Sequence, residues 1–219
     1  MVVDAALSIL RSEGPEAITM RRVATALETG AASLYVYVSG REDLLELMLD
    51  RVISTVELEV PDPGRWREQL VALLERLHRA LKAHRGIAAM TLADSPTTAA
   101  VLDLIENLMG ILLAGGLQPQ DAAWGCDLLI SLVTATARED DVRHPHDATA
   151  VGSRGDDLFA TFQGLPESRF PLLVAHAAQM VAGDGQERFR FAIDVAIDGM
   201  LARARPGPSR AGRQRTRHN

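Results

Sequence analysis

Residues 17–38 read AITMRRVATALETGAASLYVYV, and this stretch decides the fold. Thr19 is a suitable N-cap for a helix whose apolar residues lie three and four positions apart and end near Leu27. The pattern breaks at Glu28, and a second short helix is predicted from Gly30 to Tyr37. The stretch therefore predicts two short helices joined by a tight turn.

A further helix is predicted on either side of this pair. The preceding helix carries apolar residues from Val3 to Leu10 and ends at Gly14-Pro15. The following helix begins at Ser39-Gly40-Arg41-Glu42, where we expect a capping box in which the Ser39 hydroxyl and the Glu42 carboxylate each accept a backbone N–H. This is the helix-turn-helix layout, in which the second helix of the central pair enters the major groove of DNA.

The rest of the chain also has helical periodicity, without convincing period-two alternation. The predicted fold class is all-α, with a three-helix helix-turn-helix head on a larger helical body. A boundary between the two parts is predicted at Pro61-Asp62-Pro63-Gly64, because prolines and glycine end helices. The head with its connecting fourth helix is therefore predicted at 1–58, and the body at 64–204. Residues 205–219 are predicted to be a disordered basic tail. Body helices are expected at 66–86, 87–92, 95–115, 119–138, 157–162, 167–182 and 186–203, with 139–157 as a loop.

Composition and charge restrict the classes of function. Hydrophobic residues make up 47% of the chain, enough for a packed core, and 4% aromatic residues argue against RNA or single-strand binding by base stacking. The net charge of −6 indicates modest nonspecific binding to nucleic acid. The single cysteine, Cys126, fits a reducing compartment. The sequence shows neither a signal peptide nor an apolar run approaching the length of ~20 residues that spans a bilayer. We therefore expect a cytoplasmic protein with no membrane partner.

The head resembles the DNA-binding domain of the TetR family of bacterial transcriptional regulators from about Val3 to Val52. Its most specific marks are Ser33-Leu34-Tyr35 followed by an aromatic residue two positions on, and a next helix that begins at Arg41 and continues with two leucines. The resemblance implies contacts with a near-palindromic double-stranded operator. The implied contact positions are Thr19, Arg21, Ala31, Ala32, Ser33, Tyr35, Tyr37 and Arg41. Arg22, beside Arg21 early in its helix, is a further candidate for a phosphate contact.

The head departs from the family pattern in three places. Glu28 stands in the turn where the family usually has glycine, so this turn is expected to be either slightly strained or reshaped. Gly30 is the N-cap of the recognition helix in place of serine or threonine. The basic arm that often precedes the first helix is missing, so either the natural start lies upstream or the protein forgoes those contacts.

Two body helices, at about 119–138 and 186–203, are apolar on more than one side. A helix on the surface of a monomer needs one apolar stripe, so we expect the second side to contact a partner subunit in a homodimer. The alternative is that both helices are central in one subunit. Residues 187–200 also resemble the last helix of the tetracycline-repressor-like C-terminal domain, where it forms part of a four-helix dimer interface.

The resemblance further implies that the body binds a small-molecule effector between its helices and thereby changes the spacing of two heads. The expected lining is Leu73, Leu77, Thr91, Leu104, Asn107, Leu108 and Leu128. This set is apolar with few polar groups, which suits a hydrophobic ligand, although ordinary core packing is the alternative for each leucine. Thr91 stands where tetracycline–magnesium recognition needs a histidine, so no such site is expected.

No cofactor or metal is expected, because His144 and His146 lie in a polar loop and lack ligand spacing with other residues. The chain also lacks a phosphate-binding glycine loop, a zinc-protease motif and a nucleophile elbow, which argues against an enzyme. The predicted function is a DNA-binding repressor that its ligand releases from the operator. The alternative is a helical dimeric small-molecule-binding protein or enzyme whose head no longer binds DNA.

Overall fold

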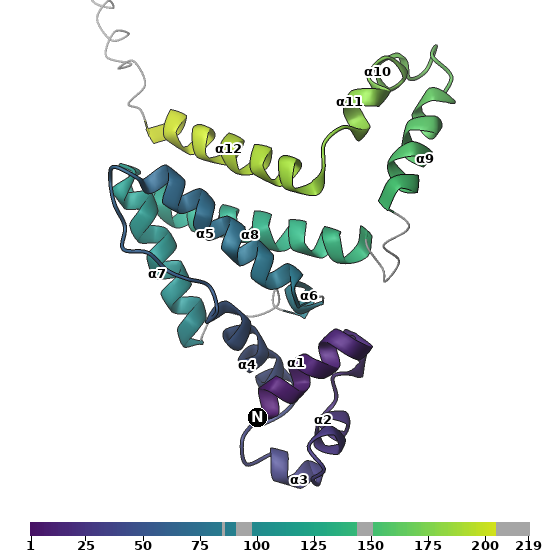
Figure 1. The fold of residues 1–219 in the computed structure, drawn as a ribbon. Helices are drawn as coiled ribbons and strands as arrows, with labels where there is room; N and C mark the ends of the chain where they lie inside the picture. Colours follow the sequence, from purple (N-terminus) through teal and green to yellow (C-terminus); the bar gives the residue numbers. More distant parts are fainter. Residues whose placement is uncertain (85, 91–97, 144–150, 205–219) are drawn as a thin grey trace, which may run out of the picture.

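The computed structural model describes residues 1–84, 86–90, 98–143 and 151–204, and every regular element in these ranges is a helix. The all-α prediction is therefore confirmed. Figure 1 shows a small head at one end, a larger helical body, and a helical arm that extends from the body. The basic tail predicted at 205–219 lies outside the described residues.

The head is built from four α-helices and one 3-10 turn. Their bounds are α1 Val2–Glu13, η1 Pro15–Ala17, α2 Met20–Ala26, α3 Ala31–Leu34 and α4 Arg41–Ile53. Helix α1 packs against α2 and α4, while α2 packs against α3. Their shared core includes five large side chains that are 2% exposed or less: Leu10, Ile18, Leu34, Leu44 and Met48. The predicted helix-turn-helix pair therefore rests on a rigid apolar base.

The two ends of the helix-turn-helix pair form as local chemistry predicts. The Thr19 hydroxyl caps α2 by accepting the Arg22 backbone N–H at 3.1 Å. Helix α3 is short, and the chain continues as a turn in which the Val38 N–H donates to the Leu34 carbonyl at 3.0 Å. The expected segment from Gly30 to Tyr37 is thus one helical turn followed by a hydrogen-bonded turn.

The predicted capping box at the start of α4 is wrong. The N-cap of α4 is Gly40, and no side chain caps it. The Asp43 carboxylate instead accepts both the Ser39 backbone N–H, at 2.7 Å, and the Ser39 hydroxyl, at 3.0 Å. The helix begins one residue later than the box requires, so the acidic side chain that reaches back to Ser39 is Asp43 instead of Glu42.

Glu28 adopts a left-handed backbone conformation with φ of 52°, as expected for the strained turn between α2 and α3. Only glycine adopts this region without a steric penalty of about 1–2 kcal/mol. Glu28→Gly is expected to stabilise the protein by about 1 kcal/mol, which urea unfolding measures. Thr29→Gly, at the next exposed position of the turn, is the control and should not stabilise. A loss of stability in Glu28→Gly would contradict the strain.

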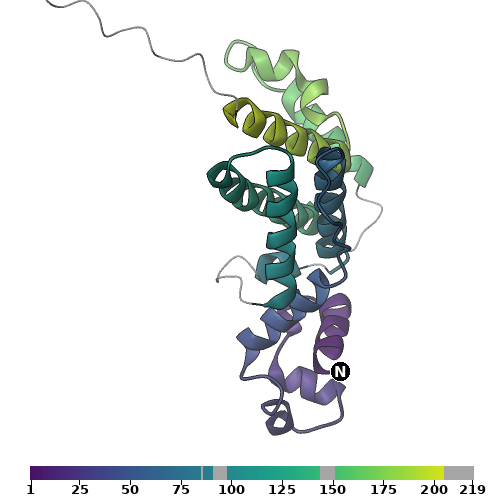
Figure 2. The same ribbon diagram turned by 90° about the vertical axis from the view of Figure 1, so that its left-hand side faces the viewer.

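The body is organised around one long helix. Its main elements are α5 Trp66–Lys82, α6 Ile87–Met90, α7 Ala99–Ala114, α8 Pro119–Arg143 and α12 Gly185–Ala204. Helix α8 packs against α5, α7 and α12, and α6 closes the end of the body that faces the head (Figures 1 and 2). Cys126 lies in α8, where burial raises the pKa of its thiol to about 11 and leaves it protonated and unreactive at neutral pH.

The loop predicted at 139–157 is wrong in extent, because α8 continues to Arg143 and α9 already begins at Val151. The single helix predicted at 167–182 is two short helices, α10 Pro171–Ala175 and α11 Ala177–Val181, separated at His176. With α9 Val151–Gln163 they form the arm, whose helices pack on one another. Among the described side chains of 155–182, only Ala177 is buried, so the arm adds little to the core of this subunit.

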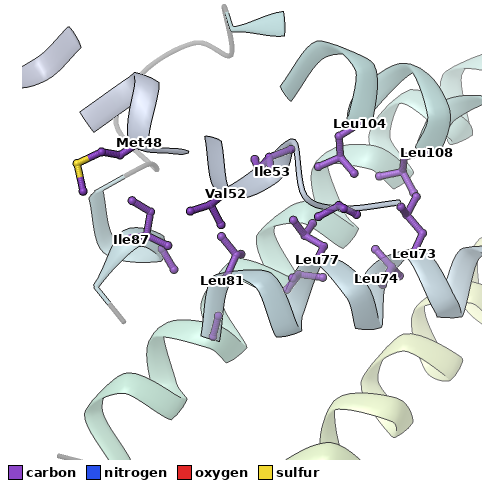
Figure 3. Close-up of a cluster of buried hydrophobic side chains, with 14 of the residues drawn as sticks. Met48, Val52, Ile53, Leu73, Leu74, Leu77, Leu81, Ile87, Leu104 and Leu108 are labelled. Carbon is purple, nitrogen blue, oxygen red and sulfur yellow. The ribbon is translucent and has the colours of Figure 1, made fainter. Parts of the chain in front are cut away.

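Helix α4 joins the head to the body. It packs against α1 in the head and against α5, α6 and α7 in the body. Figure 3 shows the result as one apolar cluster, in which Met48 of α4 lies near Ile87 of α6, and Val52 and Ile53 of α4 lie beside leucines of α5 and α7. Among the described residues, no helix combines the length and apolarity that a membrane crossing requires.

Candidate functional site

The outermost end of the head presents an exposed tip, which we define as residues 35–37. Helix α3 and this tip lie at the end of the molecule farthest from α12 (Figure 1). The side chains of Tyr35, Val36 and Tyr37 are 57%, 79% and 66% exposed, although Leu34 beside them is only 2% exposed. Exposed apolar groups on a rigid base mark a contact surface. Sequence reasoning missed Val36, since a lone valine next to two tyrosines carries no distinct signal.

The face of α3 next to the tip carries only small side chains. Ala32 and Ser33 are exposed, and Ala31 is half-buried. Gly30 is the N-cap with extended backbone, as predicted. Because none of these side chains projects far, the backbone of α3 can approach a partner closely, as major-groove readout requires.

Arg21 and Arg22 lie side by side in the first turn of α2 but differ in their surroundings. Arg21 is exposed. Arg22 bonds the Glu13 carboxylate at the end of α1 through two nitrogens, with Nε at 3.0 Å from Oε2. These hydrogen bonds from Arg22 lower the pKa of the Glu13 carboxyl. The predicted phosphate contact of Arg22 therefore competes with an internal ion pair, while that of Arg21 does not.

Arg41 and Thr19 both form hydrogen bonds that stabilise the start of α2. The Arg41 Nε donates to the Ile18 carbonyl at 2.9 Å, across 23 residues of sequence. The next residue, Thr19, caps α2. Both predicted contact residues remain exposed at the surface. They consequently hold the helix-turn-helix pair in place and still present polar atoms to the outside.

The candidate ligand residues divide into separate groups. Leu73 and Leu77 of α5 lie together with Leu104 and Leu108 of α7 in the buried cluster of Figure 3, each at most 3% exposed. Asn107 instead points to the segment after α4, where its Nδ2 donates to the Glu59 carbonyl at 2.7 Å. Leu128 lies outside the cluster and is 50% exposed. Thr91 lies outside the described residues.

Helices α8 and α12 each have a buried face and an exposed apolar face. On the buried side, Leu129 of α8 and Ile193 of α12 are fully inaccessible. The exposed side, which we call the open face, consists of Trp124, Leu128, Phe191 and Val195, at 59%, 50%, 71% and 54% exposure. The two helices pack against each other, and each of them carries two residues of the open face. Leu128, which was expected to line the ligand pocket, belongs to this surface.

Comparison with known proteins identifies the family. A family model for bacterial regulatory proteins of the tetR family matches residues 2–48. A second, for the tetracyclin repressor-like C-terminal domain, matches residues 60–204. The chain belongs to the TetR family. It is therefore a DNA-binding transcriptional regulator, and the α2–α3 pair is its helix-turn-helix.

Several TetR-family proteins are similar over most of their length. ActR from Streptomyces coelicolor in complex with actinorhodin superposes with a TM-score of 0.87 at 38% identity, over 94% of this chain and 96% of ActR. A structure of ActR with (S)-DNPA has a TM-score of 0.84 at 38% identity and covers 93% and 96% of the two chains. The HTH-type transcriptional repressor DrrR1 from Streptomyces coeruleorubidus is 28% identical over 207 residues, 91% of this chain and 75% of DrrR1.

Within this TetR-family head, Glu13→Gln is expected to strengthen operator binding by about threefold, because it frees Arg22 for a phosphate. The slope of log affinity against log salt concentration should steepen by about 1 for each head. Fluorescence anisotropy at several salt concentrations measures both quantities. Glu16→Gln, which removes an equal charge from the adjoining η1, is the control. Equal gains in the two variants would indicate a general charge effect, and weaker binding by Glu13→Gln would indicate that the pair positions α2.

Proposed function

We propose that this regulator is a homodimeric repressor that binds a near-palindromic operator and is released from it by a hydrophobic small molecule. The observation that carries the proposal is the exposed tip of Tyr35, Val36 and Tyr37 on a fully packed head. Neighbouring exposed apolar and phenolic side chains of this kind are typical of a surface that contacts a partner. Base edges with thymine methyls, flanked by phosphates, match its chemistry.

The proposed DNA contacts follow from what each side chain offers. Tyr35 and Tyr37 present hydroxyls to phosphates, and Arg21 and Arg41 present cations. Ala31, Ala32 and Ser33 allow the start of α3 to approach base edges. Thr19 contributes through its cap on α2. Arg22 takes part only when it leaves Glu13.

The proposed dimer forms through the open face of α8 and α12. Trp124 and Phe191 together expose two large aromatic side chains, which in a homodimer would pack against their copies across a twofold axis. Two heads on such a dimer read two half-sites about 34 Å apart, one turn of DNA. The division into a DNA-binding domain at 1–58 and a ligand-binding and dimerisation domain at 64–204 is part of this proposal.

We further propose that the effector resembles the ligands of ActR, namely actinorhodin or (S)-DNPA. The similarity to ActR extends over the body, and Leu73, Leu77, Leu104 and Leu108 supply an apolar environment between α5 and α7. Release from DNA requires that the effector bind more tightly to a conformation that does not fit the operator.

A gel-shift experiment tests the proposal with the duplex upstream of the protein's own gene. We expect a dissociation constant of about 10 nM or tighter for a near-palindromic site, weakening as salt rises. Adding actinorhodin or (S)-DNPA should release the DNA, and thermal shift should detect the binding independently. A protein that shows no sequence-specific binding to any duplex at low salt would contradict the proposed repressor function. Binding to an operator without response to either compound would contradict the ligand class alone.

A further inference from the structure

The head touches the body at a second place besides α4. Pro15, the first residue of η1, lies with its ring against the backbone of Gly86, directly before α6. A Cβ atom on Gly86 would lie 3.1 Å from Cγ, 3.2 Å from Cβ and 3.3 Å from Cδ of Pro15. Gly86 has φ of +85°, which also favours glycine. The two residues are therefore in close contact, with no room for a side chain between them.

On the head side, this contact leads directly to the helix-turn-helix. Pro15 opens η1, which ends at Ala17 and is followed by the fully buried Ile18. The Ile18 carbonyl accepts the Arg41 Nε, and Thr19 caps α2. A displacement of Pro15 is therefore passed within four residues to the start of α2.

On the body side, the contact leads into the core. Gly86 immediately precedes α6, whose Ile87 and Ala88 are 0% and 1% exposed. Helix α6 packs against α8, α5 and α4. Since packed interiors transmit displacement instead of absorbing it, a shift of α6 moves Gly86 as well.

The other connection between head and body runs through α4 and is held by its own hydrogen bonds. The Asp50 carboxylate of α4 accepts the Ala100 N–H at the start of α7, at 2.8 Å. After α4, the Glu57 carbonyl accepts Arg76 Nη1 at 3.0 Å, and the Val60 carbonyl accepts Gln69 Nε2 at 2.9 Å. These bonds hold the exit of α4 to the body. The Pro15–Gly86 contact bypasses α4 and gives the head a second point of support, which restricts its rotation about that helix.

We propose that Pro15 and Gly86 are positioning residues that set the orientation of the helix-turn-helix relative to the body through a contact that bypasses α4. The proposal rests on the repressor function proposed above, because orientation matters only when two heads must fit two half-sites. The van der Waals contact limits how closely η1 can approach the backbone directly before α6.

The test is Gly86→Ala, with Gly116→Ala as its matched control. Gly116 has the same φ of +85° in the turn between α7 and α8, but a Cβ atom there meets nothing within 4 Å. Both variants carry the same backbone strain, and only Gly86→Ala pushes against Pro15. We expect Gly86→Ala to weaken operator binding by at least about tenfold and Gly116→Ala to stay within about twofold of wild type. Equal operator affinities in the two variants would overturn the proposal.

Two further measurements separate positioning from loss of fold or loss of function. Pro15→Ala removes Cγ and Cδ of the ring and so makes room for a side chain at position 86. The double variant Pro15→Ala/Gly86→Ala should therefore bind the operator more tightly than Gly86→Ala alone. Equal affinities of the double and the single variant would count against the contact. The orientation of the head can also be measured without DNA, as the distance between two spin labels. One label is placed at Ser8→Cys on α1 and the other at Arg79→Cys on α5, in a Cys126→Ser background. Dilution with unlabelled protein keeps the measured distance within one subunit. An unchanged label distance in Gly86→Ala would overturn the proposal, whereas a wild type that binds no duplex would instead overturn the repressor function.

Discussion

The double variant Tyr35→Ala/Tyr37→Ala is expected to bind the operator at least about 100-fold more weakly than wild type, because each lost hydrogen bond to a charged phosphate contributes about 1.5–3 kcal/mol. Both side chains are more than half exposed, so neither contributes much to the head core. The unfolding temperature and the oligomeric state should therefore remain those of wild type. Binding is measured by fluorescence anisotropy with the duplex found by gel shift.

Tyr35→Phe/Tyr37→Phe is the matched control for the tip, because it removes the hydroxyls and keeps the rings. We expect this variant to lose most of the affinity that the alanine variant loses, since phenolic hydroxyls can bond phosphates and rings cannot. Retention of full affinity by the phenylalanine variant would assign the contact to the rings. Wild-type affinity in the alanine variant would show that the tip is not part of the DNA interface.

The double variant Trp124→Glu/Phe191→Glu is expected to be a folded monomer whose operator affinity is lower by at least about 1,000-fold, because the two half-sites are no longer bound together. It places two charges in an apolar interface, and the twofold symmetry repeats each of them. The two side chains are 59% and 71% exposed in the subunit, so the fold itself should tolerate the change. Sedimentation equilibrium measures the mass and circular dichroism the helix content.

Leu102→Glu is the control for the dimer experiment. Leu102 lies on α7 and is 50% exposed, the same exposure as Leu128 on the open face, but it belongs to neither α8 nor α12. We expect this variant to remain dimeric and to bind the operator as wild type does. A Trp124→Glu/Phe191→Glu protein that sediments as a dimer would contradict the open face as the interface.

Local features of the sequence predicted the elements of the head well. Thr19 caps α2, the helix-breaking pair Gly14-Pro15 follows α1, and Glu28 occupies the turn with positive φ, all as expected. Each of these depends on residues close together in the chain. The arm was predicted poorly, because its helices pack mainly on one another and bury only Ala177 among the described side chains of 155–182, so burial against the body does not set where they end.

The sequence alone determined that this protein is helical and that residues 17–38 form a helix-turn-helix, because periodicity, caps and breakers act over a few residues. Only the tertiary structure decided which partners the side chains have. It pairs Arg22 with Glu13, places Leu128 on the open face instead of in the buried cluster, and brings Pro15 against Gly86. These contacts join residues on different helices, and the rotation and docking of each helix depend on how the whole core packs.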